Sequence, residues 1–427
     1  MQRIQKHFLV DNLSQTKEQL LAWGNQHTTV AWLDSNSHLK STTEGILAVG
    51  TISNLSTDYR NSFAQLKSYI TPLQDYVFGF LGYDLKNDVE NLTSTNTYEV
   101  DFPDMYFFQP KKIIEITAKE VIFKYPLAFK NEIDKDWKNI NTFVNTKTVK
   151  NSIQIKHRID KENYIQQVKK ALTEIHLGNV YELNFCQEFY AENALIDPLQ
   201  TYLDLNTISA TPFASYLKME HLFLLSASPE RFLKKTGETL ISEPIKGTAK
   251  RRSDVQKDQE QIHLLKNNTK EIAENIMIVD LVRNDLSHIA QKGSVKVDEL
   301  CGIYSFKQVH QMISTISCQI QHNIHPVDAI KACYPMGSMT GAPKIAAMNL
   351  IEELEASKRG IYSGAVGYFT PELDFDFNVV IRSIVYNAQK KYVSFSVGSA
   401  ITAMANPEKE YEECLLKAKA MRAVLSN

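Results

Sequence analysis

The stretch that decides the fold is residues 361–397, IYSGAVGYFTPELDFDFNVVIRSIVYNAQKKYVSFSV. Its apolar residues fall into runs at 361–370, 376–387 and 391–397, with short polar turns between them. Runs of this length bounded by polar residues predict consecutive strands of an antiparallel meander. A final helix is predicted after them, over about residues 408–424.

The chain before this stretch carries helical patterns with clear ends. Asp160 can cap a helix whose apolar stripe runs from Tyr164 to Ile175, and Gly178 follows as a stop. Helices and strands occur in blocks rather than in alternation, which predicts the α+β class with antiparallel sheets. The remaining predicted helices and strands lie at 221–227, 239–244, 268–283 and 343–355.

The most polar stretch is 131–152, NEIDKDWKNINTFVNTKTVKNS. Its Asn, Lys and Asp content predicts a surface connection. We therefore expect an N-terminal region over 1–150 and a second, catalytic domain over 155–424.

Composition excludes several classes of protein. The 427 residues carry 47 basic and 49 acidic side chains, a formal charge of −2, so no net positive field attracts nucleic acid or an anionic membrane. No apolar run approaches the roughly 18–20 residues that span a bilayer, and we expect no signal peptide. The five cysteines are widely spaced without C-x-x-C, which indicates reduced thiols. We expect a soluble cytoplasmic enzyme.

Two pairs of glutamates suggest a metal site. Glu271 and Glu274 lie three apart on one predicted helix, and Glu410 and Glu413 lie three apart on another. Residues at i and i+3 share a helix face, so two facing helices would gather four carboxylates. Such a cluster needs a cation, and oxygen ligands suit Mg²⁺. The alternative is that these glutamates lie on solvated faces.

Two further side chains are candidates for catalysis. Lys246 follows a strand in the tight turn Glu243–Thr248, where burial would depress its pKa and free the amine as a nucleophile. The alternative is a surface lysine. Glu230, in Ser228–Arg231, is a candidate general acid favoured by burial, or else an ion-pair partner of Arg231 or of a neighbour.

The meander supplies candidates for binding an anion. Arg382 interrupts an otherwise apolar strand, which indicates either a bound carboxylate or a structural salt bridge. Gly398, Ser399 and Ala400 could offer backbone N–H groups after the last strand, although a plain loop is the default. His310 lies in an apolar stretch typical of a core histidine.

Segments of the second part, taken together, resemble the chorismate-utilising enzymes. The resemblance covers about residues 155–424 in collinear order, and the N-terminal part matches more weakly, best at 79–84. The segments that carry it are Gly178–Gln187, Ser228–Phe232, Pro244–Thr248, Lys270–Asp285, Gly337–Lys344, Tyr362–Tyr368, Ile381–Ser383 and Gly398–Glu413.

The resemblance implies layered antiparallel sheets with helices outside, and a site for chorismate. It implies that Glu274 and Glu413 hold Mg²⁺ directly and that Glu271 and Glu410 reach its waters. The residues that it implies around the substrate are Gly247, Thr248, His310, Tyr362, Arg382 and the amides of Gly398, Ser399 and Ala400.

Within the family, the segment PIKGT at 244–248 is similar to the aminodeoxychorismate synthases. This similarity implies that Lys246 attacks C2 of chorismate while the 4-hydroxyl leaves, and that ammonia then adds at C4. It also implies that Glu230 is the general acid and base. It also implies a separate glutamine amidotransferase subunit as the source of ammonia, and a role in para-aminobenzoate and folate synthesis.

Two alternatives stay open on the sequence alone. One is anthranilate synthase component I, which typically has Ala at the position of Lys246. The other is a non-catalytic subunit that binds chorismate or tryptophan. Isochorismate synthases have Lys at the position of Glu182, which argues against that activity. Most other members of the family have Gln at this position, so Glu182 is a departure from the usual residue. Ala400 is a second departure, because many members have Gly there. The tryptophan-site motifs are matched only in part, at Trp32–Ser35 and Pro212–Ala214.

Overall fold

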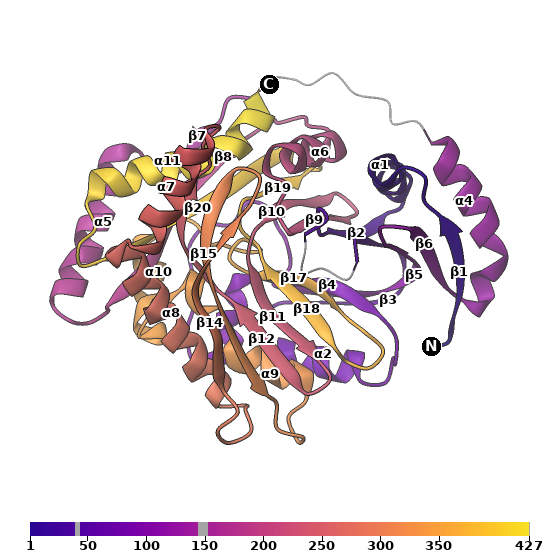
Figure 1. The fold of residues 1–427 in the computed structure, drawn as a ribbon, viewed down its shortest axis with the longest axis horizontal. Coiled ribbons are helices and arrows are strands. Elements are labelled where there is room, and N and C mark those ends of the chain that lie inside the picture. Colours follow the sequence, from indigo (N-terminus) through magenta and orange to yellow (C-terminus); the bar gives the residue numbers. More distant parts are fainter. Residues whose placement is uncertain (39–42, 144–152, 427) are drawn as a thin grey trace.

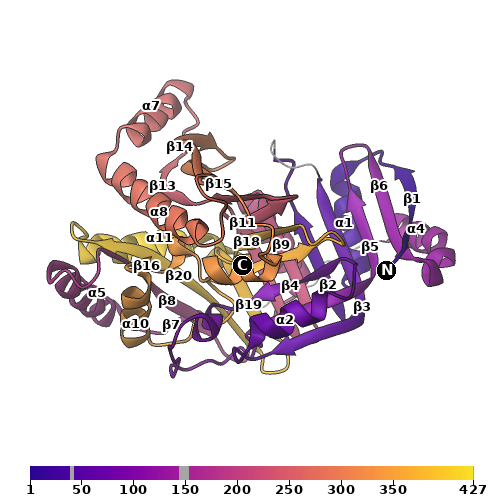
Figure 2. The same cartoon turned by 90° about the horizontal axis from the view of Figure 1, so that it is seen from below.

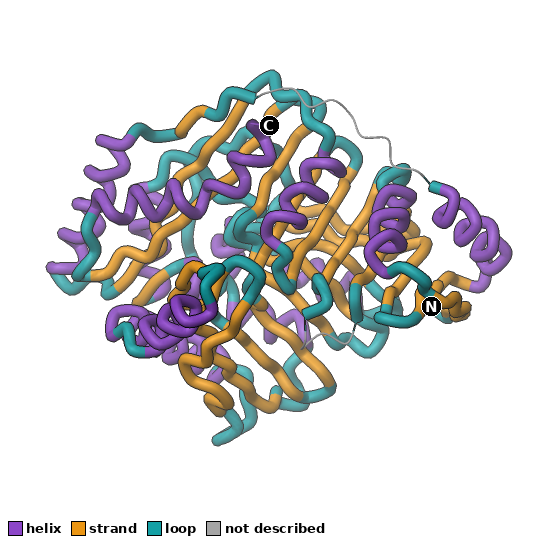
Figure 3. Tube along the Cα trace, turned by 45° about the horizontal axis from the view of Figure 1, so that its top comes forward, coloured by secondary structure: helices purple, strands orange, loops and turns teal. Residues whose placement is uncertain are grey.

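The computed structural model describes residues 1–38, 43–143 and 153–426. Within them, hydrogen bonds link the strands into one antiparallel network that divides at β5 into two layers. Figure 1 shows the strands as the centre of the molecule, and Figure 3 shows the helices around them. No helix of the described residues is long and apolar enough to cross a membrane.

We call the first layer the β15 layer. It runs from β4, which pairs with β5, through four further strands to β15 and the two other strands that pair with β15. In pairing order it contains β4 (Val77–Leu81), β17 (Ala365–Phe369), β18 (Phe375–Val379), β11 (Arg231–Thr236), β12 (Thr239–Glu243), β15 (Val309–Gln319), and on β15 also β13 (Ile245–Lys250) and β14 (Lys296–Ser305).

The second layer, here the β20 layer, begins on the other edge of β5 (Met105–Ile116), which also pairs with β6 (Glu120–Pro126) and through it with β1 (Arg3–Leu9). In pairing order it contains β3 (Gly45–Thr57), β2 (Thr29–Asp34), β9 (Phe213–Met219), β10 (Leu222–Ser228), β19 (Ser383–Asn387), β20 (Tyr392–Thr402), β8 (Glu182–Ala191), and on β8 also β7 (Lys156–His157) and β16 (Gly341–Ala342).

Helices cover the outer faces of both layers, as the two perpendicular views show (Figure 1, Figure 2). The core of the β15 layer includes α2 (Ser62–Ile70), α8 (Thr269–Ser287) and α9 (Pro326–Cys333). The core of the β20 layer includes α1 (Leu13–Gly24), α4 (Ile133–Thr142), α5 (Lys161–His176), α6 (Pro198–Ser209), α10 (Lys344–Leu354) and α11 (Pro407–Ser426). The short α3 (Lys86–Val89) and α7 (Val255–Lys266) complete the α-helices of the described residues, and short 3₁₀ helices lie at Tyr83–Leu85, Leu127–Glu132 and Gly337–Met339.

A third cluster of buried side chains lies between the two layers. It joins Phe80 of β4 and Val366 of β17 with Ala31, Leu224 and Val385 of the β20 layer. This burial of apolar surface from both faces holds the layers together. The layered α+β architecture with outer helices is therefore confirmed.

The local signals of helix α5 act as predicted. The Asp160 side chain accepts a hydrogen bond from the backbone N–H of Asn163, and Gly178 follows the helix with φ +81°. Tyr164, Val168 and Ala171 on its apolar stripe are fully buried. The cap satisfies one of the free N–H groups of the first turn, which is why the helix begins there.

The predicted meander is wrong in its middle. Residues 376–387 are two strands, since β18 pairs with β11 and β17 in one layer while β19 pairs with β10 and β20 in the other. The chain crosses between the layers at 380–382, and Arg382 has φ +52° there. Residues 376–387 stay mostly apolar because both β18 and β19 are buried. The hydrophobic pattern therefore gives no sign of the break between the two strands.

The predicted surface connection at 131–152 is wrong over its first half. Residues 133–142 form helix α4, because Ile133, Trp137 and Ile140 place one apolar stripe against the core in a polar segment. Residues 144–152, where the boundary at about 150 was expected, lie outside the described residues.

Candidate active site

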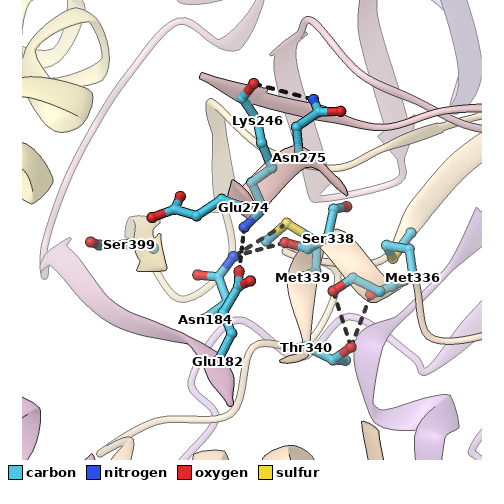
Figure 4. A network of polar contacts seen from close by, with 12 residues as sticks. Glu182, Asn184, Lys246, Glu274, Asn275, Met336, Ser338, Met339, Thr340 and Ser399 are labelled. Atoms are coloured by element: carbon cyan, nitrogen blue, oxygen red, sulfur yellow. Dashed lines mark hydrogen bonds and ion pairs between the residues drawn. The ribbon is translucent and has the colours of Figure 1, made fainter. Parts of the chain in front are cut away.

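Lys246 on β13 reaches from the β15 layer to β8 of the β20 layer. Its Nζ is 2.6 Å from Glu182 Oε1, and the two side chains are 10% and 1% exposed. Figure 4 shows the pair with Asn184 and Glu274 around it. The lysine is therefore shielded from water between the layers, rather than exposed in a surface turn.

The charge of Lys246 is set by its carboxylate partners. Burial lowers the pKa of Lys246, but the negative charges of Glu182, Glu274 and Glu230 outweigh burial and raise that pKa above its usual value. The expectation of a depressed pKa is wrong, because the burial of this lysine comes with a carboxylate at hydrogen-bond distance. The amine must lose a proton before it can attack.

Gly247 lets β13 pass close to helix α8. Its φ is +94°, and a Cβ at this position would lie 3.2 Å from both Glu271 Oε2 and Met312 Cβ. The pairing of β13 with β15 also shifts register between Ile245 and Thr248. The glycine and this irregularity turn Lys246 toward β8 while the strand continues.

Glu230 lies between β10 and β11 and is 5% exposed. Burial raises the pKa of its carboxyl to about 7. A hydrogen bond with Ser338 and the positive charge of Lys246 lower this pKa, but by less than burial raises it. Arg231 pairs instead with Asp376 and Glu243, so the alternative of an Arg231–Glu230 ion pair is wrong. A carboxyl that is half protonated near neutral pH can both give and take a proton.

The two glutamate faces meet around one lysine. Lys270 Nζ lies 3.7 Å from Glu274 Oε1 on α8 and 3.9 Å from Glu410 Oε1 on α11. On α11, Lys417 Nζ is 2.6 Å from Glu413 Oε1. Glu274 and Glu410 are therefore buried on either side of Lys270, whereas Glu413 is 46% exposed and pairs with Lys417.

The pKa values of this cluster differ with its lysine contacts. Burial raises the pKa of Glu274 to about 7 and raises those of Glu271 and Glu410. Burial acts on Glu413 in the same direction, but Lys417 and Lys270 outweigh it and lower its pKa. A pKa of about 7 leaves Glu274 partly protonated at neutral pH.

The cluster fits a divalent cation by its donors. Its oxygens are all carboxylate, which is the donor type of Mg²⁺ sites, and the buried Glu274 Oε1 has no hydrogen-bond partner in the part of the chain that the structure describes. Among the described residues, however, no three His, Cys, Asp or Glu side chains are gathered closely enough to hold an ion as they stand. Side-chain movement away from Lys270 and Lys417 would be needed.

Arg382 is a partly buried cation without a carboxylate partner among the described residues. Its guanidinium makes no hydrogen bond or ion pair within residues 1–38, 43–143 and 153–426, and burial lowers its pKa against the charges of Tyr362 and Glu413. Tyr362 is buried nearby and accepts a weak hydrogen bond from Cys186. A structural salt bridge is therefore not its role, and an anionic ligand would stabilise it.

The segment Gly398–Ala400 lies within β20, not in a loop after the last strand. It pairs with Cys186, Phe185 and Asn184 of β8, while β19 pairs only with Tyr392–Val393–Ser394. Its other edge carries no strand among the described residues. A Cβ on Gly398 would lie 2.4 Å from Asn184 Oδ1, which explains the glycine. Ser399 donates its hydroxyl to Glu410, which joins the segment to the glutamate cluster.

His310 and Thr248 occupy β15 and β13. His310 is fully buried, with Nε2 3.0 Å from Asp258 Oδ1 and Nδ1 2.8 Å from Ser305 Oγ. Both ring nitrogens have partners, as in a core histidine. Thr248 is exposed and pairs with Gln311.

A cavity of about 100 Å³ lies beside the site. It is lined by both partly matched tryptophan-site segments, through Leu33–Ser35 and Pro212–Ala214, and by Ile245, the neighbour of Lys246. Arg231 and its partners Glu243 and Asp376 also line it. The two segments, far apart in sequence, thus meet at one cavity.

Sequence reasoning missed three participants. Ser338 hydrogen-bonds Glu230, Asn184 donates to the Ser338 carbonyl at 3.0 Å, and Lys270 joins the glutamate faces. The i, i+4 spacing of Lys270 and Glu274 was the available signal. Glu182 was noted only as a departure from the usual residue, whereas it is the partner of Lys246.

A match between nearly the whole chain and one family of enzymes decides which family the chain belongs to. The sequence pattern of the chorismate binding enzymes matches residues 5–423. The chain belongs to this family. The chorismate binding enzymes include relatives at 30% identity or more along most of this chain.

The relatives have different lengths. The aminodeoxychorismate synthase component 1 of Escherichia coli K12 is 33% identical over 346 residues, 80% of this chain and 75% of the relative. The probable chloroplastic aminodeoxychorismate synthase of rice (Oryza sativa subsp. japonica) is 42% identical over 268 residues, 62% of this chain but only 30% of the rice protein.

Solved structures show the same fold. Anthranilate synthase component I of Streptococcus pneumoniae TIGR4 superposes with a TM-score of 0.80 at 23% identity, over 88% of this chain and 91% of that one.

Proposed function

We propose that this chorismate binding enzyme is the large subunit of an aminodeoxychorismate synthase. It would convert chorismate and ammonia to 4-amino-4-deoxychorismate for para-aminobenzoate and folate synthesis. The observation that carries the proposal is Lys246, a nucleophile buried between the layers with Glu182 and Glu230 near it. The names of the rice and Escherichia coli relatives support the same activity.

The first half-reaction makes a covalent bond to the enzyme. The Lys246 amine forms a bond to C2 of chorismate, the ring double bonds shift, and the C4–O bond breaks. Hydroxide is a poor leaving group, so the protonated Glu230 gives it a proton and it leaves as water. The pKa of Glu230 at about 7 supports this role, because the acid form is populated at neutral pH.

The second half-reaction releases the product. Ammonia forms a bond to C4, the double bonds shift back, and the C2–N bond to Lys246 breaks. The new C4 ammonium returns a proton to the Glu230 carboxylate. Atoms balance as chorismate plus ammonia giving 4-amino-4-deoxychorismate plus water.

Chorismate would bind through its two carboxylates. Arg382 without a carboxylate partner, Tyr362 beside it and the Gly398–Ala400 edge support binding of the pyruvyl carboxylate. Gly247, Thr248 and His310 are proposed to line the ring. Glu274 and Glu413, with Glu271 and Glu410 behind them, would hold Mg²⁺. When bound, the ion supplies positive charge that offsets the ring carboxylate.

Ammonia is proposed to come from a separate glutamine amidotransferase subunit. The "component 1" names of the Escherichia coli and Bacillus subtilis relatives support a second component. Every residue of the proposed site lies within 155–424, which supports a catalytic domain over that range. Five free cysteines support a cytoplasmic location.

The test is product identification with a matched variant. The purified chain is incubated with chorismate, Mg²⁺ and ammonium at mildly alkaline pH, and the product is identified by mass spectrometry. We expect a product that keeps the pyruvyl group and has an amine in place of the ring hydroxyl. Lys246→Ala should abolish it.

The other products would overturn the proposal. Anthranilate with free pyruvate would identify an anthranilate synthase. Unchanged chorismate, even with the amidotransferase and glutamine added, would indicate a binding subunit. Full amination by Lys246→Ala would exclude the covalent step.

A further inference from the structure

The Glu182 side chain has an unusual setting for a carboxylate. It belongs to the first residue of β8, which pairs with Ala342 of β16 and Thr402 of β20, and it is 1% exposed. Its Oε1 holds Lys246, whereas its buried Oε2 has no hydrogen-bond partner within residues 1–38, 43–143 and 153–426. Glu182 is therefore a water-excluded carboxylate whose hydrogen bonding within the described residues rests on the lysine alone.

Glu182 is also the nearest acceptor for a proton of Lys246. The other charged groups that face the lysine are Glu230, at the end of β10, and Glu274 on α8. Among the described residues, only Glu182 lies within 4.0 Å of Lys246 Nζ as an ion-pair partner. Glu230 is committed to the leaving oxygen in the proposed reaction, so it cannot serve the amine in the same step.

We propose that Glu182 is the base that frees the Lys246 amine for its attack on chorismate. This inference rests on the proposed function. The ammonium passes one proton to Glu182 Oε1 across the 2.6 Å contact, which leaves a neutral amine and a neutral carboxylic acid. The amine electron pair then forms the bond to C2, as C4–O breaks with the proton from Glu230.

The proton count closes over one turnover. After the attack the nitrogen is a secondary ammonium, and breaking its bond to C2 returns Lys246 as a neutral amine. Glu182 therefore gives its proton back to this amine, or keeps it for the next cycle. The transfer changes no net charge within the buried pair, whereas loss of the proton to bulk water would leave Glu182 as an unpaired buried anion.

The position of Glu182 explains why its identity matters. A Gln at this place would still fill the space and accept a hydrogen bond through its carbonyl, but it would not take up a proton. Removing the carboxylate would also remove the charge that raises the pKa of Lys246. The two roles, base and holder of a charged lysine, predict opposite effects of E182Q, so they can be separated by experiment.

The experiment measures formation of the enzyme adduct without ammonia. Wild type, E182Q and E182D are mixed with chorismate and Mg²⁺, quenched at increasing times, and examined by intact-protein mass spectrometry for the addition of chorismate minus water. Rates are taken from pH 6 to pH 9. The control is E188Q, which removes another buried carboxylate of β8 that pairs with Arg158 and Tyr392. Circular dichroism checks the fold of each variant.

With Glu182 as base, E182Q forms the adduct about 10²-fold more slowly at pH 7, and its rate relative to wild type rises with pH because solvent must remove the proton. E182D keeps a carboxylate, so it should retain the wild-type pH profile at a reduced rate. If E182Q does not fold, the pH profile of E182D still tests whether the carboxylate is the base. E188Q is unchanged. An E182Q rate equal to or above wild type at pH 7 would overturn the inference, since the carboxylate would then only hold the lysine charged.

Failure of the proposed function is distinguishable from failure of this inference. If wild type forms neither the adduct nor the aminated product, the covalent mechanism is wrong and the inference falls with it. If wild type forms both while E182Q matches it, the function stands and the role of Glu182 is wrong.

Discussion

Burial sets the acid strength of Glu230. Because its side chain is excluded from water, its charged form is disfavoured and the pKa of the carboxyl is raised to about 7. A general acid works only in its protonated form. At saturating Mg²⁺ and ammonia, we therefore expect kcat/KM for chorismate to fall as pH rises above about 7, in proportion to the remaining acid.

Glu230→Gln tests this assignment. The amide cannot give a proton to the leaving oxygen, so kcat should fall by about 10²–10⁴-fold and the alkaline limb near pH 7 should disappear. Steady-state rates of 4-amino-4-deoxychorismate formation across pH provide the measurement. A limb that persists in Glu230→Gln would assign the titration to another group.

Arg382 is expected to act through its charge and its planar shape. Arg382→Lys keeps the charge but loses the two-pronged contact with a carboxylate, so KM for chorismate should rise about tenfold or more, in line with about 1.5–3 kcal/mol for a charged hydrogen bond. Arg422→Lys on α11 is the matched control. An unchanged KM in Arg382→Lys would show that the pyruvyl carboxylate binds elsewhere.

At the scale of elements, helix α5 depends on a short local signal. The Asp160 side chain accepts the N–H of Asn163 in the first turn. Asp160→Ala should lower the free energy of unfolding by about 1 kcal/mol, while Asp160→Asn should keep most of it, because Asn also caps helices. Urea denaturation of the three proteins measures the difference, and equal losses in Ala and Asn would point to the charge rather than the cap.

The crossover between β18 and β19 shows how one element boundary serves the site. Because the chain leaves one layer and enters the other at 380–382, Arg382 is brought to the space between them with φ +52°. A continuous strand, as expected from the apolar run, would have placed the guanidinium on a sheet face. The break therefore has a function in the proposed mechanism.

At the scale of the molecule, the glutamate cluster joins two helices that are distant in sequence. Mg²⁺ that binds Glu274 of α8 and Glu413 of α11 should raise the thermal stability of the whole chain, by about 2.7 kcal/mol at a hundred times its dissociation constant. With a pKa of about 7, Glu274 must lose a proton before it can bind the ion, so binding should be tighter at pH 8 than at pH 6.

Isothermal titration with MgCl₂ and thermal melts with and without EDTA measure this effect at both pH values. Glu274→Gln should abolish most of the Mg²⁺ response and its pH dependence. A response of the same size in Glu274→Gln would mean that the ion binds at another place in the chain.

Much of the fold could be predicted because its signals are local. Asp160, the stripe from Tyr164 to Ile175, and Gly178 act within a few residues of one another, so the pattern of α5 is complete in the sequence. Helix α4 was missed because its apolar stripe is short and lies in a polar segment. The split of 376–387 was missed because both strands are buried and no turn residue separates them.

The sequence by itself determined the α+β class, helices α5, α8, α10 and α11, strands β10, β12, β17 and β20, and most of the charged residues that the proposed chemistry needs. Only the tertiary structure decided that Lys246 meets Glu182, 64 positions away along the chain, that Arg382 has no carboxylate partner among the described residues, and that Lys270 joins the faces of α8 and α11. The physical reason is the distance along the chain over which each interaction acts. Caps and periodicity depend on neighbours along the chain, whereas the pKa of a buried group depends on which charges the packing of the two layers brings next to it.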